Sequence, residues 1–194
     1  MTTLLTGLVV FLGVHSISIV APQWRNRMAQ QLGPRAWQAI YALAALIGFV
    51  LIVRGYGEAR LAATVLYTSP QWLKDVTVGL MVLFFPLLLA AYLPGRIRAV
   101  VRNNPMLVAT KLWATAHLLA NGTVADVALF GGFLAWAAAD RISLKFREPR
   151  PVPALPATRW NDLVAIVGGL ALYVAFILGL HLALIGVPAY VRWP

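Results

Sequence analysis

The run VTVGLMVLFFPLLLAAYL, residues Val76–Leu93, gives the clearest indication of how this chain folds. All 18 of its residues are uncharged. A helix needs about 20 mostly apolar residues to cross the hydrocarbon core of a bilayer. The run therefore predicts a transmembrane helix. Pro86 predicts a kink within it, because proline has no amide hydrogen to donate to the helix.

The composition of the whole chain agrees with a membrane protein. Of the 194 residues, 61% are hydrophobic and 11% charged, and the mean hydropathy is +0.79. Soluble domains are nearer to half apolar and about a quarter charged. The absence of cysteine excludes disulfides and thiolate metal sites. The net charge of +10 comes from basic residues in the loops, which favours lipid headgroups over nucleic acid.

Five further apolar stretches are long enough to be spans. The fold class predicted is all-α: an integral membrane bundle of about six transmembrane helices in one domain, residues 1–194. The first stretch resembles a secretory signal, but we expect it to be retained, because no basic residue precedes it. Asn121–Thr123 predict a tight turn between two antiparallel helices. The five stretches are 4–20, 37–53, 106–120, 124–139 and 163–187.

The basic residues predict the orientation of the bundle. One set of loops carries 12 Lys and Arg residues and the other carries 4. Cytoplasmic loops are the richer ones in membrane proteins. Both termini are therefore expected in the periplasm, in a multi-pass protein of the bacterial inner (cytoplasmic) membrane. The proline-rich stretch Arg147–Trp160 is expected to be a stiff cytoplasmic linker.

Two histidines, His15 and His117, lie deep inside predicted spans. An ionisable side chain in the membrane is costly, so it indicates function by default. Both are expected in the middle third of the bilayer. Ala114 leaves room beside the His117 ring for a flat body, and Trp113 is placed to pack against one. The third histidine, His181, lies near the outer end of the last span, where a structural role is expected and a third metal ligand is the alternative.

Two neutral imidazoles without an acidic ligand are typical of a b-type haem. Zinc and non-haem iron normally take a third protein ligand, often a carboxylate. The acids of this chain fall at predicted helix ends or in loops. His15 and His117 are therefore the predicted iron ligands, and Trp113 and Ala114 the predicted haem contacts. The alternative is that each imidazole only hydrogen-bonds a neighbouring helix.

Four stretches carry a resemblance to a known family: GLVVFLGVHSISIVAPQWRNRM, AIYALAALIGFVLIVRGYG, RNNPMLVATKLWATAHLLANG and HLALIGVPAY. The chain resembles the NnrU family of bacterial membrane proteins, which is similar to zeta-carotene isomerase, a membrane enzyme with haem b. The resemblance implies His15 and His117 as the haem ligands. The family name implies a role near nitrite and nitric oxide reduction.

Two positions depart from what the resemblance implies. The isomerase has a cysteine three residues before its second histidine, where this chain has Ala114. A ligand switch that uses this thiolate is therefore excluded. Asn104-Pro105 stands where relatives carry His-Pro, an element also found in isoprenylcysteine-type membrane methyltransferases.

The leading hypothesis is a bis-histidine haem-b membrane protein, a redox or nitric-oxide-related factor associated with denitrification. The alternatives are a haem-dependent cis–trans isomerase of a polyene, a cofactor-free assembly protein and, with least support, a methyltransferase. The partners expected are the lipid bilayer and either an apolar polyene or a redox partner, but no nucleic acid.

Overall fold

The structure is a computed structural model that describes residues 1–62, 64–101, 104–148 and 154–190. The described chain is almost wholly helical, and its one isolated β-bridge pairs Val65 with Thr123. The predicted all-α class is therefore confirmed. The chain divides into two compact units, each described by itself. Unit 1 is Met1–Leu66 with Thr123–Pro149, and unit 2 is Tyr67–Gly122 with Arg150–Pro194. The single domain predicted over 1–194 stays a prediction.

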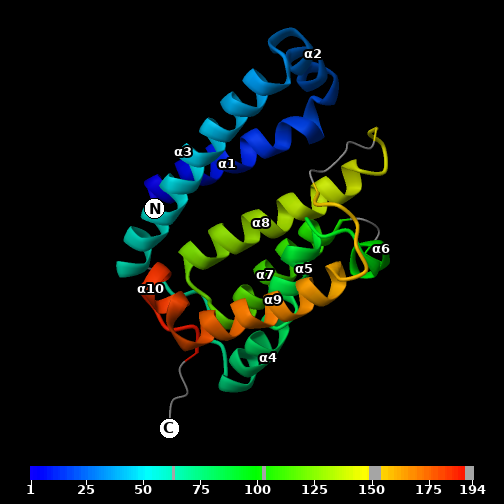
Figure 1. Cartoon of the computed structure of the whole chain (residues 1–194). Helices are drawn as coiled ribbons and strands as arrows, with labels where there is room; N and C mark the ends of the chain where they lie inside the picture. Colours follow the sequence, from blue (N-terminus) through cyan, green and yellow to red (C-terminus); the bar gives the residue numbers. More distant parts are fainter. Residues whose placement is uncertain (63, 102–103, 149–153, 191–194) are drawn as a thin grey trace. The chain divides into compact units, whose positions relative to one another are not determined.

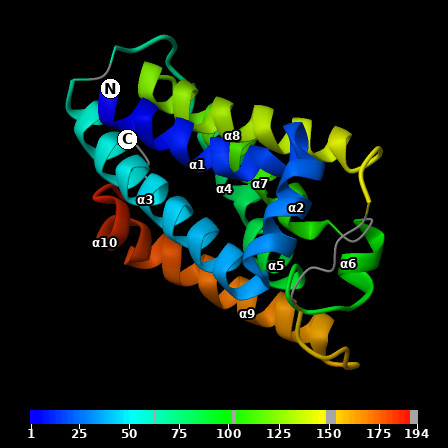
Figure 2. The same cartoon turned by 90° about the horizontal axis from the view of Figure 1, so that it is seen from above.

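Unit 1 is built on a tightly packed pair of helices, α1 (Thr2–Val20) and α3 (Pro34–Leu61). The two lie side by side in Figures 1 and 2. Glycines let the two backbones touch: a methyl group at Gly48 would lie 2.7 Å from the amide nitrogen of Phe11. Small residues permit such close approach between membrane helices. Helix α8 (Val124–Ser143) packs against α1.

A short helix that the sequence did not predict joins α1 to α3. Helix α2 (Pro22–Leu32) begins with proline, which suits the first helical position, where its missing amide hydrogen costs nothing. It ends at Gly33, whose φ of 80° favours glycine. Trp24 of α2 packs edge-on against Trp37 of α3, with ring centroids 6.1 Å apart.

Unit 2 contains a broken span, α4 (Gln71–Met81) and α5 (Phe84–Ala90). The break at Val82 and Leu83 is the kink predicted for Pro86, placed one turn earlier than the proline. A proline ring clashes with the carbonyl group four residues before it, which here belongs to Val82. Helices α6 (Arg96–Val100) and α7 (Pro105–Ala120) follow.

The last span also belongs to unit 2 and is made of three pieces. Helix α9 (Asn161–Ala175) leads into η1 (Phe176–Leu180), a segment that is kinked at Gly179, and α10 (His181–Ile185) follows. Gly169 of α9 meets the backbone of Pro86, whose Cα atom would lie 2.6 Å from a methyl group there. Gly169 therefore permits close packing of α9 against α5. A methyl group at Gly131 of α8 would instead meet only Val127 of its own helix, at 4.0 Å.

Four described stretches are long and apolar enough to cross a membrane: Thr2–Val20, Pro34–Leu61, Gln71–Ala90 and Asn161–Ile185. Many of their large apolar side chains are exposed, among them Leu43 at 61%. Such a surface is suited to lipid, so the chain is a multi-pass membrane protein. The count of six spans is not confirmed. Helix α7 has 16 residues, about 24 Å at the helical rise, while Asp126, Asp140 and Arg141 lie within α8.

Several sequence predictions concern residues that the structure leaves out or leaves undecided. The charge count includes Arg102, Arg150 and Arg192, which lie outside the described residues. The proline-rich linker is only partly described; residues 154–158 are not helical, and the Leu155 amide donates to the Tyr92 carbonyl at 2.9 Å. The predicted pairing of the helices before and after Asn121–Thr123 joins unit 2 to unit 1, so it stays a prediction.

Candidate functional site

His15 lies in α1 of unit 1 and is held by its own helix. Its Nδ1 atom is 2.7 Å from the carbonyl oxygen of Phe11, one turn earlier. A carbonyl oxygen only accepts hydrogen bonds, so Nδ1 donates and carries the ring hydrogen. In the neutral imidazole, Nε2 then carries the lone pair. Nδ1 bonds of this kind are typical of histidines that bind metal through Nε2.

Aromatic side chains surround the His15 ring. Phe11 stacks on it, with ring centroids 4.2 Å apart. Tyr41 of α3 and Trp136 of α8 approach edge-on, at 5.3 Å and 5.8 Å. The indole Nε1 of Trp136 is buried and has no hydrogen-bond partner among the described residues. Buried donors without partners are rare in proteins, so this N–H group indicates a missing acceptor.

His117 lies in α7 of unit 2 and repeats the arrangement of His15. Its Nδ1 atom is 2.9 Å from the carbonyl oxygen of Trp113, so Nε2 again carries the lone pair. The Trp113 ring packs beside the imidazole, with centroids 5.4 Å apart. Ala114, the other predicted haem contact, is fully buried.

The end of α7 that carries His117 is fixed by polar contacts. The side-chain amide of Asn121 donates to the His117 carbonyl at 2.9 Å. The Tyr67 hydroxyl donates to the carbonyl oxygens of Leu118 and, at 2.8 Å, Asn121. These bonds satisfy carbonyl groups that a helix leaves open at its C-terminus. The last turn of α7, which begins at His117, is therefore fixed by side-chain hydrogen bonds at its start and at its end.

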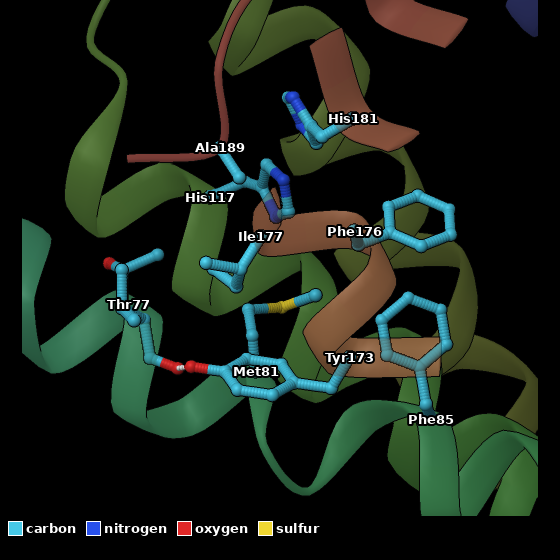
Figure 3. A pocket seen from close by; sticks show the side chains of 10 residues that line it. Thr77, Met81, Phe85, His117, Tyr173, Phe176, Ile177, His181 and Ala189 are labelled. Atoms are coloured by element: carbon cyan, nitrogen blue, oxygen red, sulfur yellow. Dashed lines mark hydrogen bonds between the residues drawn. The ribbon is translucent and has the colours of Figure 1, made fainter. Parts of the chain in front are cut away.

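His117 also lines a cavity in unit 2, together with His181 (Figure 3). We call this cavity the two-histidine pocket. It offers about 60 Å³ to water-sized molecules. Benzene fills an engineered cavity of about 150 Å³, so this pocket is too small for an aromatic ring as it stands. The lining residues are Thr77, Val78, Met81, Phe85, His117, Tyr173, Phe176, Ile177, His181 and Ala189.

His181 was expected to be structural, and the sequence did not place it with His117. It follows the kinked segment η1, and its Nδ1 atom is 2.7 Å from the carbonyl oxygen of Val187. Its Nε2 therefore also carries the lone pair. The spacing of four residues from Tyr173 to Ile177 and from Ile177 to His181 was the signal available in the sequence, although the kink at Gly179 lies between Ile177 and His181.

The hydroxyl groups of the two-histidine pocket donate to backbone carbonyls. The Thr77 hydroxyl lies 3.0 Å from the Leu73 carbonyl oxygen and 2.8 Å from that of Ala116. The Tyr173 hydroxyl donates to Val78 at 3.2 Å. No carboxylate is among the described residues that line this pocket. Its polar character therefore comes mainly from the two imidazoles.

The acidic side chains, predicted at helix ends or in loops, bond to other parts of the protein. Asp126 forms a capping box with Thr123 and accepts from the Tyr56 hydroxyl at 2.6 Å. Asp140 pairs with Arg147 at 2.7 Å. Asp162 accepts from the amides that begin α6. Within the described ranges, no group of three His, Cys, Asp or Glu residues is placed to hold a metal ion.

The structure brings His117 and Trp113 together, and His117 with His181. His15 belongs to unit 1 and His117 to unit 2, so the binding of both to one iron stays a prediction.

Comparison with known proteins supports the resemblance seen in the sequence. No curated protein and no solved structure matches the chain. The family described as NnrU protein matches residues 3–189. The chain therefore belongs to the NnrU family.

Proposed function

We propose that this chain is an integral membrane haem-b protein whose iron is bound by His15 and His117. One observation carries the proposal: both imidazoles donate Nδ1–H to the carbonyl group four residues earlier, at 2.7 Å and 2.9 Å. Each Nε2 is thereby prepared as a neutral ligand, as in axial ligands of haem. Bis-histidine ligation requires units 1 and 2 to bring both Nε2 atoms to one iron.

The surroundings of the two histidines suit a tetrapyrrole. Phe11, Tyr41 and Trp136 around His15, and Trp113 beside His117, offer apolar flat surfaces. The Trp136 N–H group, buried without a partner among the described residues, suits an acceptor on a bound group. A porphyrin dianion neutralises ferrous iron, so neutral ligands avoid a buried net charge. The two-histidine pocket is too small for the macrocycle as it stands, so haem binding at His117 requires its walls to move apart.

The haem would supply reversible one-electron chemistry or nitric oxide binding at iron. The residues of this chain hold the iron, orient the ligand rings and exclude water with aromatic side chains. Membership of the NnrU family supports a redox or nitric-oxide-related role associated with denitrification. We place the protein in the bacterial inner membrane, with both termini in the periplasm, on the basis of the basic residues in its loops.

The absorption spectrum of the purified protein tests the proposal. Full-length protein in detergent is expected to show a Soret band after expression with haem supplied. His15→Ala and His117→Ala should each lose the band or bind haem far more weakly, whereas His181→Ala should keep it. A Soret band that survives in both of the first two variants would overturn the assignment.

The same sample tests the cofactor-free alternative. The Nδ1 bonds of His15 and His117 stay within their own helices, so they do not by themselves join helices as an assembly role would need. Protein that folds and purifies without haem, even with haem supplied, would favour an assembly protein over the haem protein.

A further inference from the structure

The two-histidine pocket gathers three side chains that bind soft metal ions. His117 comes from α7, His181 from α10 and Met81 from the end of α4. In the view of Figure 3, His117 lies between the other two. We propose that haem-free protein binds one Cu(I) ion in this pocket, with the imidazole Nε2 atoms of His117 and His181 and the thioether sulfur of Met81 as ligands.

The two imidazoles are prepared to bind through the same atom. His117 Nδ1 donates to the Trp113 carbonyl at 2.9 Å, and His181 Nδ1 donates to the Val187 carbonyl at 2.7 Å. Metal-binding histidines in proteins show this bond, because it fixes the tautomer and the ring orientation. The last span is kinked at Gly179, two residues before His181, where the backbone leaves helical geometry (φ 171°, ψ −18°). The kink changes the direction of the helix that carries His181.

The size of the pocket favours an ion over an organic ligand. A volume of about 60 Å³ is well below the roughly 150 Å³ that benzene fills. A quinone ring or a polyene would need the walls to move. A single metal ion needs no such movement.

The charge and softness of the donors favour Cu(I) over other ions. Imidazole and thioether groups bind a metal as neutral ligands, and the described lining has no carboxylate. The solvation cost of a buried ion rises with the square of its charge, so a divalent ion would cost about four times as much as a monovalent one. Thioether sulfur selects Cu(I), and imidazole suits copper. The Thr77 and Tyr173 hydroxyls donate to carbonyls and add no negative charge.

The copper site goes beyond the haem proposal, and the two proposed sites share one ligand atom, Nε2 of His117. Nε2 of His117 bonds one metal at a time, so haem and copper exclude each other on one chain. His15 serves only the haem, while His181 and Met81 serve only the copper. Variants of these residues therefore separate the two proposals.

The test is a competition titration of haem-free, full-length protein in detergent with Cu(I) buffered by bicinchoninate. One Cu(I) per chain is expected. His181→Ala and Met81→Leu should each weaken binding by at least about 100-fold, because loss of a ligand exceeds the usual effect of its outer partners. Met28→Leu, which also removes a thioether, and His15→Ala should bind copper as the unchanged protein does. Far-ultraviolet circular dichroism confirms that each variant is folded.

Two results would overturn the copper site: the chelator keeps all the copper, or His181→Ala and Met81→Leu bind it as tightly as the unchanged protein. Failure of the haem proposal looks different. In that case the Soret band is absent or survives in His15→Ala, and the copper titration is unaffected. X-ray absorption of the copper-loaded protein should show nitrogen and sulfur neighbours, and the sulfur should be lost in Met81→Leu.

Discussion

The regions around His15 and His117 share the same hydrogen bond within the helix but differ in the side chains that face the imidazole ring. In both, Nδ1 donates to the carbonyl group one turn earlier in the helix. His15 is packed by Phe11, Tyr41 and Trp136. His117 instead lines a cavity that it shares with His181.

The helix backbone sets the tautomer of each histidine, whereas the packed side chains determine what its Nε2 atom can bind. A helix of any sequence has a carbonyl group four residues before a histidine. The Nδ1 bond to this carbonyl therefore fixes only the tautomer of the ring. The neighbours set what Nε2 can bind. Around His15 the one buried polar group without a described partner is a donor, Trp136 Nε1. Around His117 the cavity adds a second lone pair from His181 and a thioether from Met81.

The largest effect is expected for His117→Ala, because His117 belongs to both proposed metal sites. This variant should lose haem and weaken Cu(I) binding by at least about 100-fold. His15→Ala should lose haem alone. Soret absorbance and copper titration of the same preparations measure both effects. Haem binding that survives in His117→Ala would contradict the haem proposal, and unchanged Cu(I) binding would contradict the copper site.

A glycine pair on α3 tests how strongly the His15 region depends on helix packing. A methyl group at Gly48 would lie 2.7 Å from the Phe11 amide nitrogen, whereas nothing lies within 4 Å of one at Gly57. Gly48→Ala should destabilise the protein by about 1–3 kcal/mol, the usual cost of overpacking. Gly57→Ala should be neutral or stabilise the helix by up to about 1 kcal/mol.

Thermal unfolding in detergent measures both glycine variants. Gly48→Ala should also weaken haem binding, since Phe11 stacks on His15 and its carbonyl accepts from His15 Nδ1. Copper binding in unit 2 should change little. Equal stability of the two variants would contradict the tight contact between α1 and α3.

Trp136→Phe tests whether the buried indole N–H serves a bound group. With haem, the variant loses a donor and should bind the cofactor about tenfold more weakly, as for other outer partners of metal ligands. Without haem, it removes a buried unpaired donor and should be neutral or stabilising. Haem affinity and thermal unfolding of the haem-free protein are the two readouts. An unchanged haem affinity would leave the Trp136 N–H group outside the haem site.

The smallest effect is expected for Thr77→Val in the wall of the two-histidine pocket. The change keeps the side-chain shape and removes the hydroxyl that lies 2.8 Å from the Ala116 carbonyl oxygen. A cost of about 0.5–1.5 kcal/mol is expected for this hydrogen bond, with copper binding within about twofold of the unchanged protein, because the hydroxyl is not a proposed ligand. A large loss of copper affinity would mean that Thr77 contacts the ion.

The sequence predicted the long apolar spans, but it missed features that depend on local backbone geometry, such as a short polar helix. The spans around Gly48 and Gly169 were found because long apolar runs have one stable solution in lipid. Helix α2 was missed because its residues are polar and its ends depend on Pro22 and Gly33. The break before Pro86 was predicted, but one turn too late.

The residues of the candidate site divide in the same way. His15, His117 and Trp113 stood out because each lies within an apolar run. His181 was assigned to the outer end of a regular helix, and the kink at Gly179 is not visible in a count at 3.6 residues per turn. Met81 was missed because an apolar side chain in a span carries no signal until a cavity places it beside two imidazoles.

Electron paramagnetic resonance of the ferric protein tests bis-histidine ligation directly, because it reports how many imidazoles bind the iron. A low-spin bis-imidazole signal is expected in the purified protein. Conversion to high-spin iron, or loss of the haem, is expected in His15→Ala and again in His117→Ala. A low-spin signal that remains unchanged in either variant would contradict the sharing of one iron by the two units.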